Sequence, residues 1–370
     1  MKPQRINGFP SSLHLALAVS VTLGAAAPLH SQSNGKARTG TVERIKVHGR
    51  ALEGNLEGES PDRDVTIYLP PSYASERNRR YPVVYLLHGY TGTDEVTWIK
   101  GRDSRPPTAN VPEIADKVFL AGTAREMILV MPNAYSIYLG SMYSNSVTAG
   151  NWEDYVAEDL VAYLDGHYRT IPDRMSRGLA GYSMGGYGTI RIGMKRPDVF
   201  ASVYALSARC LTANISPRVE GMAAAEAIKT REDVAKAERG PLGTFARAAA
   251  WSPNPDNPPL YLDLPVKDGK TRPEVVAKWA ANAPLAMIDQ YIPNLKKLHA
   301  IAFDIGNQDE AVQPRTIKTL DEILTRSGVT HTYETYEGTH SGRIPERLET
   351  RMLPFFSSNL SAAPSRSTKH

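Results

Sequence analysis

The sequence predicts an α/β protein with a mainly parallel central sheet, on two observations. The uninterrupted apolar runs Val83–Leu87 and Met127–Met131 are typical of strands buried on both faces of a parallel sheet. Other segments repeat apolar residues every three or four positions, as amphipathic helices do. Buried strands that alternate with such helices indicate an α/β domain.

The first strands are expected to be antiparallel. Thr41–His48 and Asp64–Leu69 alternate apolar and polar residues, which is typical of half-exposed strands. The turn-rich segment Glu57–Asp62 lies between them. We therefore expect a hairpin before the parallel strands begin.

Helices and strands continue toward the C-terminus. Asn151 is a good N-cap for a helix whose apolar residues between 152 and 164 share one face. A second amphipathic helix ends near Gly328. Leu298–Phe303 and Thr330–Tyr336 are predicted to be later strands of the same sheet.

The segment Gly181–Gly186 contains a G-x-S-x-G pattern centred on Ser183. A short apolar strand, Arg177–Ala180, precedes it, and an apolar-rich stretch that we expect to be helical follows. Strand, serine and helix in this order predict a nucleophile elbow with a strained serine backbone. The alternative is a glycine-rich turn without catalytic meaning.

A serine hydroxyl needs a base within hydrogen-bond reach to become a nucleophile. In a sheet built around such an elbow the acid and then the histidine follow the serine in the chain, so the base is His299, His331, His340 or His370. His340 is favoured because it follows the last predicted strand in a loop, whereas His299 and His331 lie in predicted strands. A surface loop histidine is the alternative for His340.

The acid should lie in the loop after strand Leu298–Phe303, where Asp304, Asp309 and Glu310 compete. Asp309 is favoured because it follows a turn that directs it back toward His340. Asp304 adjoins the strand and stays an alternative, as does Glu310.

Two backbone N–H groups are expected to stabilise the oxyanion of a tetrahedral intermediate. One belongs to Met184, directly after the proposed nucleophile. The other belongs to Tyr90, in the loop that follows Val83–Leu87, where Gly89 allows close approach of the backbone. The side chain of His88 is interpreted as structural.

Trp98, Tyr143 and Asn145 are candidate substrate-binding residues, together with the neighbouring Tyr138 and Met142. They follow predicted strands in loops that should border the cleft, where they would line an acyl or aromatic pocket. Ordinary packing at the rim of the cleft is the alternative.

Residues 1–31 resemble a signal peptide. Lys2 and Arg5 precede the apolar stretch Leu13–Leu23, and the small residues Ala25–Ala27 follow it. The stretch is short for a membrane span. We expect a secreted or periplasmic protein without stable membrane insertion, with an uncleaved anchor as the alternative.

The remaining chain divides into a flexible segment 32–40, a catalytic domain 41–356 and a disordered tail 357–370. Within the domain, residues 211–297 form a helical and proline-rich insertion, which we expect to cover or line the site as a cap. Scaffold remote from the chemistry is the alternative for this insertion.

Composition excludes several functions. The formal net charge is +4 without a basic block, which gives no support for nucleic-acid binding. The single cysteine, Cys210, rules out an intrachain disulfide framework and is expected to be buried. The histidines are scattered, so no metal site is predicted.

The motifs His88-Gly89, Gly181–Gly186, Gly306-x-x-Asp309 and Gly338-Thr339-His340 resemble those of the Putative esterase family of α/β-hydrolases. This family includes esterase D (S-formylglutathione hydrolase), enterochelin esterases, feruloyl esterases and mycolyltransferases. The resemblance runs from about Thr41 to Phe356. It implies an α/β-hydrolase fold and a cofactor-free serine ester hydrolase. It also implies that Ser183, Asp309 and His340 form the triad and that Tyr90 and Met184 supply the oxyanion donors.

The sequence departs from the family in two places, the residues after His340, which lack an aromatic often found there, and the long insertion. Both leave the substrate open. The hypothesis is an exported serine carboxylic-ester hydrolase acting on small or aryl acyl esters, such as feruloyl or acetyl groups on a polysaccharide. The alternatives are an acyltransferase of mycolyltransferase type and a non-catalytic binding protein on the same fold.

Overall fold

The computed structural model describes residues 39–100, 108–212, 219–312 and 314–363. The predicted signal peptide 1–31, most of segment 32–40 and the end of the predicted tail lie outside these residues. The described residues all belong to one compact unit.

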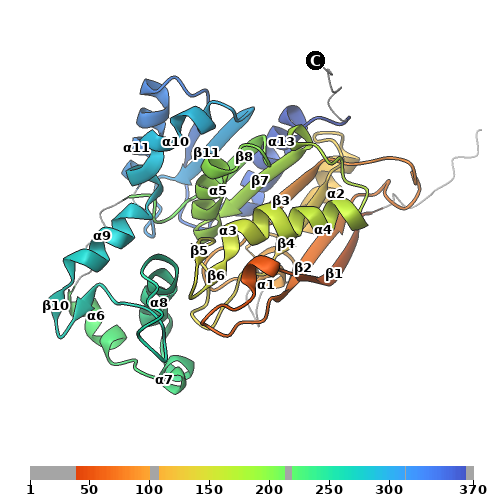
Figure 1. Ribbon diagram of the computed structural model, residues 1–370. Coiled ribbons are helices and arrows are strands. Elements are labelled where there is room, and N and C mark those ends of the chain that lie inside the picture. The colour runs from red at the N-terminus through yellow and green to blue at the C-terminus, as the bar shows by residue number, and fades with distance from the viewer. Residues whose placement is uncertain (1–38, 101–107, 213–218, 313, 364–370) are drawn as a thin grey trace, which may run out of the picture. The chain divides into compact units, whose positions relative to one another are not determined.

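The described chain contains an eight-stranded sheet in the order β1-β2-β4-β3-β7-β8-β11-β12 (Figure 1). β1 and β2 pair antiparallel, as do β2 and β4, and every other neighbouring pair is parallel. The predicted α/β class with a mainly parallel sheet is therefore confirmed. The strands are β1 (Thr41–His48), β2 (Asp62–Leu69), β3 (Val83–Leu87), β4 (Ile128–Pro132), β7 (Arg177–Tyr182), β8 (Ser202–Leu206), β11 (Ala300–Gly306) and β12 (Thr332–Tyr336).

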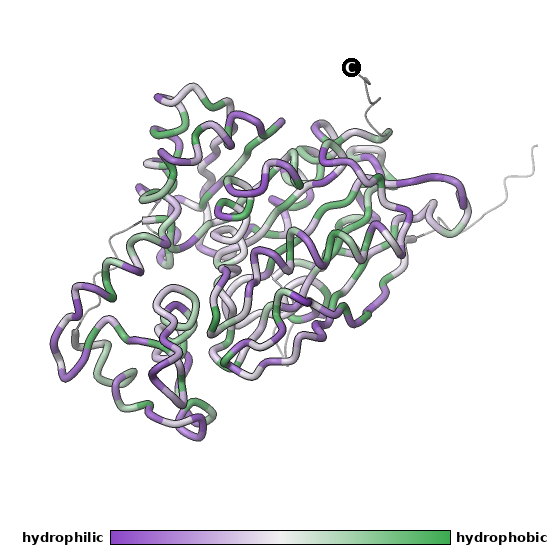
Figure 2. Tube along the Cα trace, in the orientation of Figure 1, coloured by the Kyte–Doolittle hydropathy of each residue, from purple (hydrophilic) through white to green (hydrophobic). Residues whose placement is uncertain are grey.

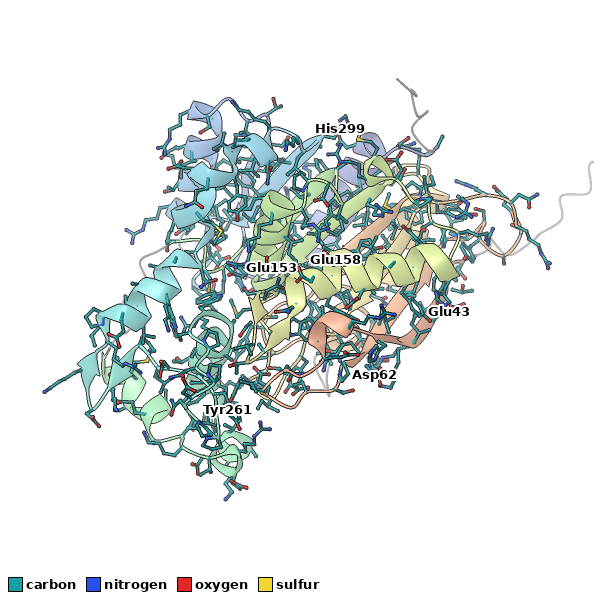
Figure 3. The ribbon with its side chains drawn as sticks, viewed as in Figure 1. Glu43, Asp62, Glu153, Glu158, Tyr261 and His299 are labelled. Atoms are coloured by element: carbon teal, nitrogen blue, oxygen red, sulfur yellow. The ribbon has the colours of Figure 1, made fainter. Side chains whose placement is uncertain are left out.

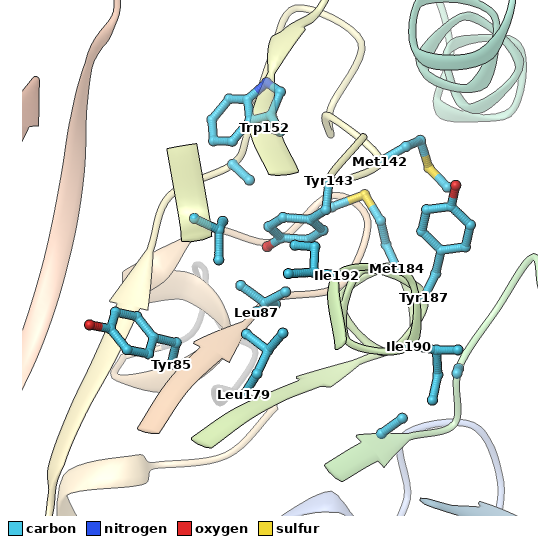
Figure 4. Packing of buried hydrophobic residues seen from close by; sticks show 14 of the residues in the cluster. Tyr85, Leu87, Met142, Tyr143, Trp152, Leu179, Met184, Tyr187, Ile190 and Ile192 are labelled. Atoms are coloured by element: carbon cyan, nitrogen blue, oxygen red, sulfur yellow. The ribbon is translucent and has the colours of Figure 1, made fainter. Parts of the chain in front are cut away.

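The central strands are buried on both faces, which explains their uninterrupted apolar sequence. In β3, Val83, Tyr85 and Leu87 belong to one hydrophobic cluster, whereas Val84 and Leu86 belong to another. Figure 4 shows Leu87 of β3 and Leu179 of β7 packed beside helix α5 in the first cluster. The sheet thus separates two cores, and its loops are free to carry the site.

Helices cover both faces of the sheet, and Figure 2 shows hydrophobic and hydrophilic residues alternating along them. Buried side chains of α4, α5 and α11 join the first cluster, and those of α2, α12 and α13 join the second. These helices are α2 (Val111–Leu120), α4 (Leu160–His167), α5 (Met184–Lys195), α11 (Pro314–Arg326), α12 (Ile344–Arg347) and α13 (Leu353–Asn359).

Shorter elements join these helices and strands. They are η1 (Arg50–Leu52), α1 (Asp94–Trp98), β5 (Asn145–Ser146), β6 (Gly150–Asn151), α3 (Trp152–Asp154), the π-helical η2 (Tyr155–Asp159), η3 (Arg174–Ser176) and the π-helical η4 (Leu348–Met352).

The helix predicted to start at Asn151 is interrupted and is capped by another residue. Asn151 makes no side-chain cap hydrogen bond. Instead, Asn145 Oδ1 accepts hydrogen bonds from the backbone N–H groups of Glu153 (2.9 Å) and Asp154 (3.2 Å). β5 and β6 pair antiparallel and place Asn145 opposite Asn151, so the cap comes from the neighbouring strand.

The excursion between β8 and β11 is mostly helical and packs on the rest of the unit. Ser146 Oγ donates to Ala249 O, and Thr148 Oγ1 donates to Tyr261 O (Figure 3). Its elements are α6 (Val219–Glu226), α7 (Arg231–Lys236), α8 (Arg239–Trp251), β9 (Val266–Lys267), β10 (Lys270–Thr271), α9 (Pro273–Ala281) and α10 (Pro284–Leu295).

The ordered chain extends past the predicted end of the domain at Phe356. Helix α13 continues to Asn359, and the next residue, Leu360, is buried in the second cluster. Ser361 N–H donates to Met175 O at 2.8 Å. The predicted start of the tail at Ser357 is therefore too early. The segment is mostly small and polar, but its one large apolar residue, Leu360, is buried.

Candidate active site

Ser183 lies at the sharp turn between β7 and α5. Its backbone has φ 57° and ψ −112°, a conformation that residues other than glycine rarely adopt. Its N–H donates to Leu206 O at 2.9 Å, which ties the turn to β8. A Cβ atom on Gly185 would lie 2.0 Å from Leu87 O, so glycine is required where α5 passes β3.

The structure brings the side chains of Ser183, His340 and Asp309 together. His340 Nε2 lies 2.9 Å from Ser183 Oγ, and His340 Nδ1 lies 2.8 Å from Asp309 Oδ2. Each residue follows a parallel strand, namely β7, β12 and β11, at the same edge of the sheet. Parallel strands therefore explain why residues so distant in sequence meet.

The carboxylate of Asp309 sets the proton arrangement on His340. Asp309 Oδ1 accepts hydrogen bonds from the N–H groups of Ala311 (2.9 Å) and Val312 (2.7 Å), which leaves Oδ2 facing the imidazole. A carboxylate only accepts hydrogen bonds, so Nδ1–H donates to it and Nε2 is free to accept the Ser183 proton. This is the geometry that a general base requires.

Asp304, the alternative acid, points elsewhere. It is buried in β11, where Oδ2 accepts hydrogen bonds from Tyr204 Oη (2.7 Å) and Arg347 Nε (2.8 Å). Burial raises the pKa of Asp304 to about 6 despite the attraction of Arg347. Glu310 is exposed. Of the three candidates, Asp309 is the one hydrogen-bonded to His340.

The loop after β3 is held by the side chain of His88. This imidazole is fully buried, and its Nε2 accepts the Ala134 N–H at 2.8 Å. Its Nδ1 therefore carries the proton and donates to Gly89 O at 2.8 Å. His88 thus fixes the backbone that presents Tyr90, in agreement with its predicted structural role.

Burial of His88 lets us predict a pH dependence of stability. Burial lowers its pKa from 6.5 to about 4, so the unfolded chain takes up this proton first as the pH falls. The stability that neutral His88 provides is complete above pH 6.5 and is lost as the pH falls toward 4. At about 1.4 kcal/mol per unit of pKa, the loss approaches roughly 3 kcal/mol.

Urea unfolding of the wild type and of His88→Gln between pH 7 and pH 4 checks this. The difference between their unfolding free energies should shrink over that range, because glutamine does not titrate. A difference that stays constant with pH would refute the assignment.

The other two described candidate bases are placed elsewhere. His331 Nε2 contacts Asp321 at 2.9 Å, and its Nδ1 donates to Val329 O at 2.8 Å. His299 precedes β11, at the end of that strand opposite to Gly306 and Asp309 (Figure 3). His370 lies outside the described residues.

Trp98, Tyr143 and Asn145, which were predicted to bind substrate, belong to the scaffold. Trp98 and Tyr143 are 1% and 0% exposed and pack in the hydrophobic clusters. Asn145 caps α3. The prediction assigned the aromatic side chains to the cleft because of their place in the sequence, but large apolar groups fill the core first.

A cavity of about 240 Å³ adjoins the elbow and the loop after β3. Tyr90 and Met184, which carry the predicted oxyanion donors, both line it. Met142, which the sequence placed in a loop bordering the cleft, lines it as well and is labelled near Met184 in Figure 4. The other lining residues were not predicted from the sequence to line a pocket. They are Arg209, Cys210, Arg239, Gly240, Gly243 and Arg247. We call this space the arginine cavity.

Cys210 is the one lining residue for which the sequence made a wrong prediction. Its side chain is partly exposed, and its backbone adopts φ 58°. The strand β8 ends at Leu206, so the apolar run before Cys210 does not extend burial to it. Among the described residues, no His, Cys, Asp and Glu side chains cluster in a way that could hold a metal ion.

The α/β sheet and the arrangement of Ser183, His340 and Asp309 define a fold of the α/β-hydrolase class. Residues 60–344 match the family described as Putative esterase. The chain belongs to this family, and the resemblance seen in the sequence is confirmed.

Two curated proteins illustrate the similarity. The chain is 30% identical over 160 residues to an endo-1,4-beta-xylanase/feruloyl esterase of Xylanibacter ruminicola, covering 41% of this chain and 21% of that protein. It is 29% identical over 181 residues to the S-formylglutathione hydrolase of Arabidopsis thaliana, covering 47% and 62%. The chain thus spans less than two thirds of either relative.

Solved structures show the same fold. A ferulic acid esterase superposes with a TM-score of 0.60 at 22% identity, covering 87% of this chain and 99% of that one. An S-formylglutathione hydrolase from Staphylococcus aureus gives 0.55 at 17% identity, covering 86% and 99%.

Proposed function

We propose that the protein is a serine carboxylic-ester hydrolase. The observation that carries the proposal is the continuous set of hydrogen bonds from Asp309 through His340 to Ser183 Oγ. Membership of the Putative esterase family supports the same reaction class.

In the proposed reaction Ser183 Oγ attacks the ester carbonyl while His340 Nε2 takes its proton. The imidazolium, stabilised by Asp309, then delivers the proton to the leaving alcohol. The N–H groups of Met184 and Tyr90 face the oxyanion in this scheme. Water, activated by His340, then hydrolyses the acyl-enzyme, which releases the acid and restores Ser183.

We further propose that residues 41–356 and the helical continuation to Asn359 form the catalytic domain, exported through residues 1–31. Lys2, Arg5 and the short apolar stretch after them support export. In the described ranges no helix has the length and apolar character needed to cross a membrane. The N-terminal residue of the mature chain, recovered from the medium or periplasm, tests this proposal.

Small or aryl acyl esters, including those attached to polysaccharide, are the proposed substrates. The similarity to proteins named feruloyl esterase supports this class. No described residue pattern favours nucleic acid or a cofactor as a partner.

A fluorophosphonate probe and product analysis test the reaction. The probe should label Ser183 in the folded protein, and 4-nitrophenyl acetate should yield acetate in water. Absence of labelling would favour the non-catalytic alternative. Transfer of acetate to a dilute alcohol faster than to water would favour the acyltransferase alternative.

A further inference from the structure

The arginine cavity carries an excess of positive charge. Its described lining residues include Arg209, Arg239 and Arg247 but neither aspartate nor glutamate. All three arginines line the same cavity as Tyr90. Burial raises the pKa of the Tyr90 hydroxyl, and the three guanidinium charges oppose that rise. Like charges that line one cavity repel one another, and a bound anion would relieve this repulsion.

Arg247 is the inner member of the set. Its Nε donates to Gly243 O at 3.0 Å, and its guanidinium carbon lies 5.0 Å from the centre of the Trp279 ring. Among the described residues it forms no ion pair, whereas the buried Arg191 and Arg347 face carboxylates at 2.7 and 2.8 Å. Burial lowers the pKa of Arg247, as expected for a cation without a counter-ion.

Arg209 and Arg239 are exposed and lie where the cavity meets the catalytic elements. The N–H of Arg209 donates to Ser183 O at 3.1 Å. The carbonyl of Arg239 accepts from Tyr90 Oη at 3.1 Å. Neither side chain forms an ion pair within the described ranges. Both cations are therefore available to a substrate held at Ser183.

The spacing on α8 shows that one side of the cavity is a single helix face. Arg239, Gly243 and Arg247 are four residues apart, so they stack along one side of the helix. Gly243 has no side chain, and a Cβ there would lie 3.4 Å from Tyr90 Oη. The glycine thus leaves space between the two arginines.

We propose that the arginine cavity binds a carboxylate group carried by the ester substrate. This inference rests on the proposed function and names its substrate class: esters that bear a free carboxylate in the acyl or the alcohol part. Guanidinium groups bind carboxylates through paired hydrogen bonds of matching geometry, which an uncharged acyl group does not offer.

Matched ester pairs test the proposal. 4-Nitrophenyl hydrogen adipate, with its acid in the acyl part, is compared with 4-nitrophenyl hexanoate. 4-Acetoxybenzoate, with its acid in the alcohol part, is compared with its methyl ester. We expect kcat/KM for one acidic ester to exceed that of its neutral partner by about tenfold or more, since hydrogen bonds to charged groups are strong. The pair that shows the preference identifies the part of the substrate in the cavity.

Charge-removing variants assign the preference. Arg247→Gln should lower the acidic-to-neutral ratio by about tenfold, and Arg209→Gln should lower it as well. Arg247→Lys keeps the charge and should retain part of the ratio. Arg326→Gln removes an exposed arginine at the end of α11 and should leave the ratio unchanged. An equal ratio in the wild type and Arg247→Gln, or no acidic preference at all, overturns the proposal.

Calorimetry separates this inference from the proposed reaction. Ser183→Ala protein should bind the preferred acidic ester more tightly than its neutral partner, and adding Arg247→Gln should abolish the difference. The same binding preference in a wild type that turns over neither ester would reject the proposed function and keep the cavity assignment. Turnover of both esters at equal rates would keep the proposed function and reject the cavity assignment.

Discussion

Replacing Ser183 by alanine is expected to lower kcat for 4-nitrophenyl acetate by about five to six orders of magnitude, as loss of a triad serine does. The reason is that His340 Nε2 then faces a methyl group, and no acyl-enzyme forms. The fold should persist, because the substitution removes the hydrogen bond to His340 and leaves the backbone bond to Leu206 in place.

Ser202→Ala is the matched control. Ser202 is also buried, but it begins β8 at the opposite end of that strand from the loop that contacts Ser183. Steady-state turnover and thermal unfolding of both variants make the comparison. If Ser183→Ala retains turnover above the uncatalysed rate, another group is the nucleophile.

Asp309→Asn is expected to lower kcat by about 10⁴ while the structure around it persists. An asparagine amide can donate a hydrogen bond to Nδ1, which would place the imidazole proton on Nε2. Such a tautomer cannot accept the Ser183 proton. The pre-steady-state rate of acylation measures this directly.

Asp304→Asn is the comparison that separates the two carboxylates. It removes a negative charge from the buried pair with Arg347, so thermal stability should fall. Its kcat should stay within a few-fold of the wild type, since Asp304 makes no hydrogen bond to His340 among the described residues. A large loss of kcat in Asp304→Asn with little effect of Asp309→Asn would reverse the assignment.

Much of the fold was predictable because burial leaves a clear pattern in the sequence. Val83–Leu87 is bounded correctly, since a strand buried on both faces must be apolar throughout. The helix after β6 starts directly after Asn151, as predicted, but its capping side chain was not predictable in this way, because it belongs to Asn145, several residues away across a strand pair. Rules for helix capping consider only residues next to the helix start, so they do not identify Asn145.

In the candidate site, too, some residues were predictable from the sequence and others were not. Ser183, Asp309 and His340 could be placed together because chain order and strand ends restrict the choice. Arg247 could not be assigned to the site from the sequence, because its place in the cavity depends on which face of α8 lies against Tyr90. The only signal in the sequence was a pair of arginines eight residues apart in an otherwise small and apolar helix. Trp98 and Tyr143 show the reverse error, because aromatic residues were assigned to the site and lie in the core.

Two of the three cavity arginines and the proposed triad come from different segments of the chain. The loops after β7, β11 and β12 carry Ser183, Asp309 and His340, whereas α8 of the excursion carries Arg239 and Arg247. Selectivity for charge can therefore drift through substitutions in one peripheral helix while the reaction machinery stays constant. We expect exchange of residues 239–251 between relatives to change the proposed charge preference while Ser183, Asp309 and His340 stay in place.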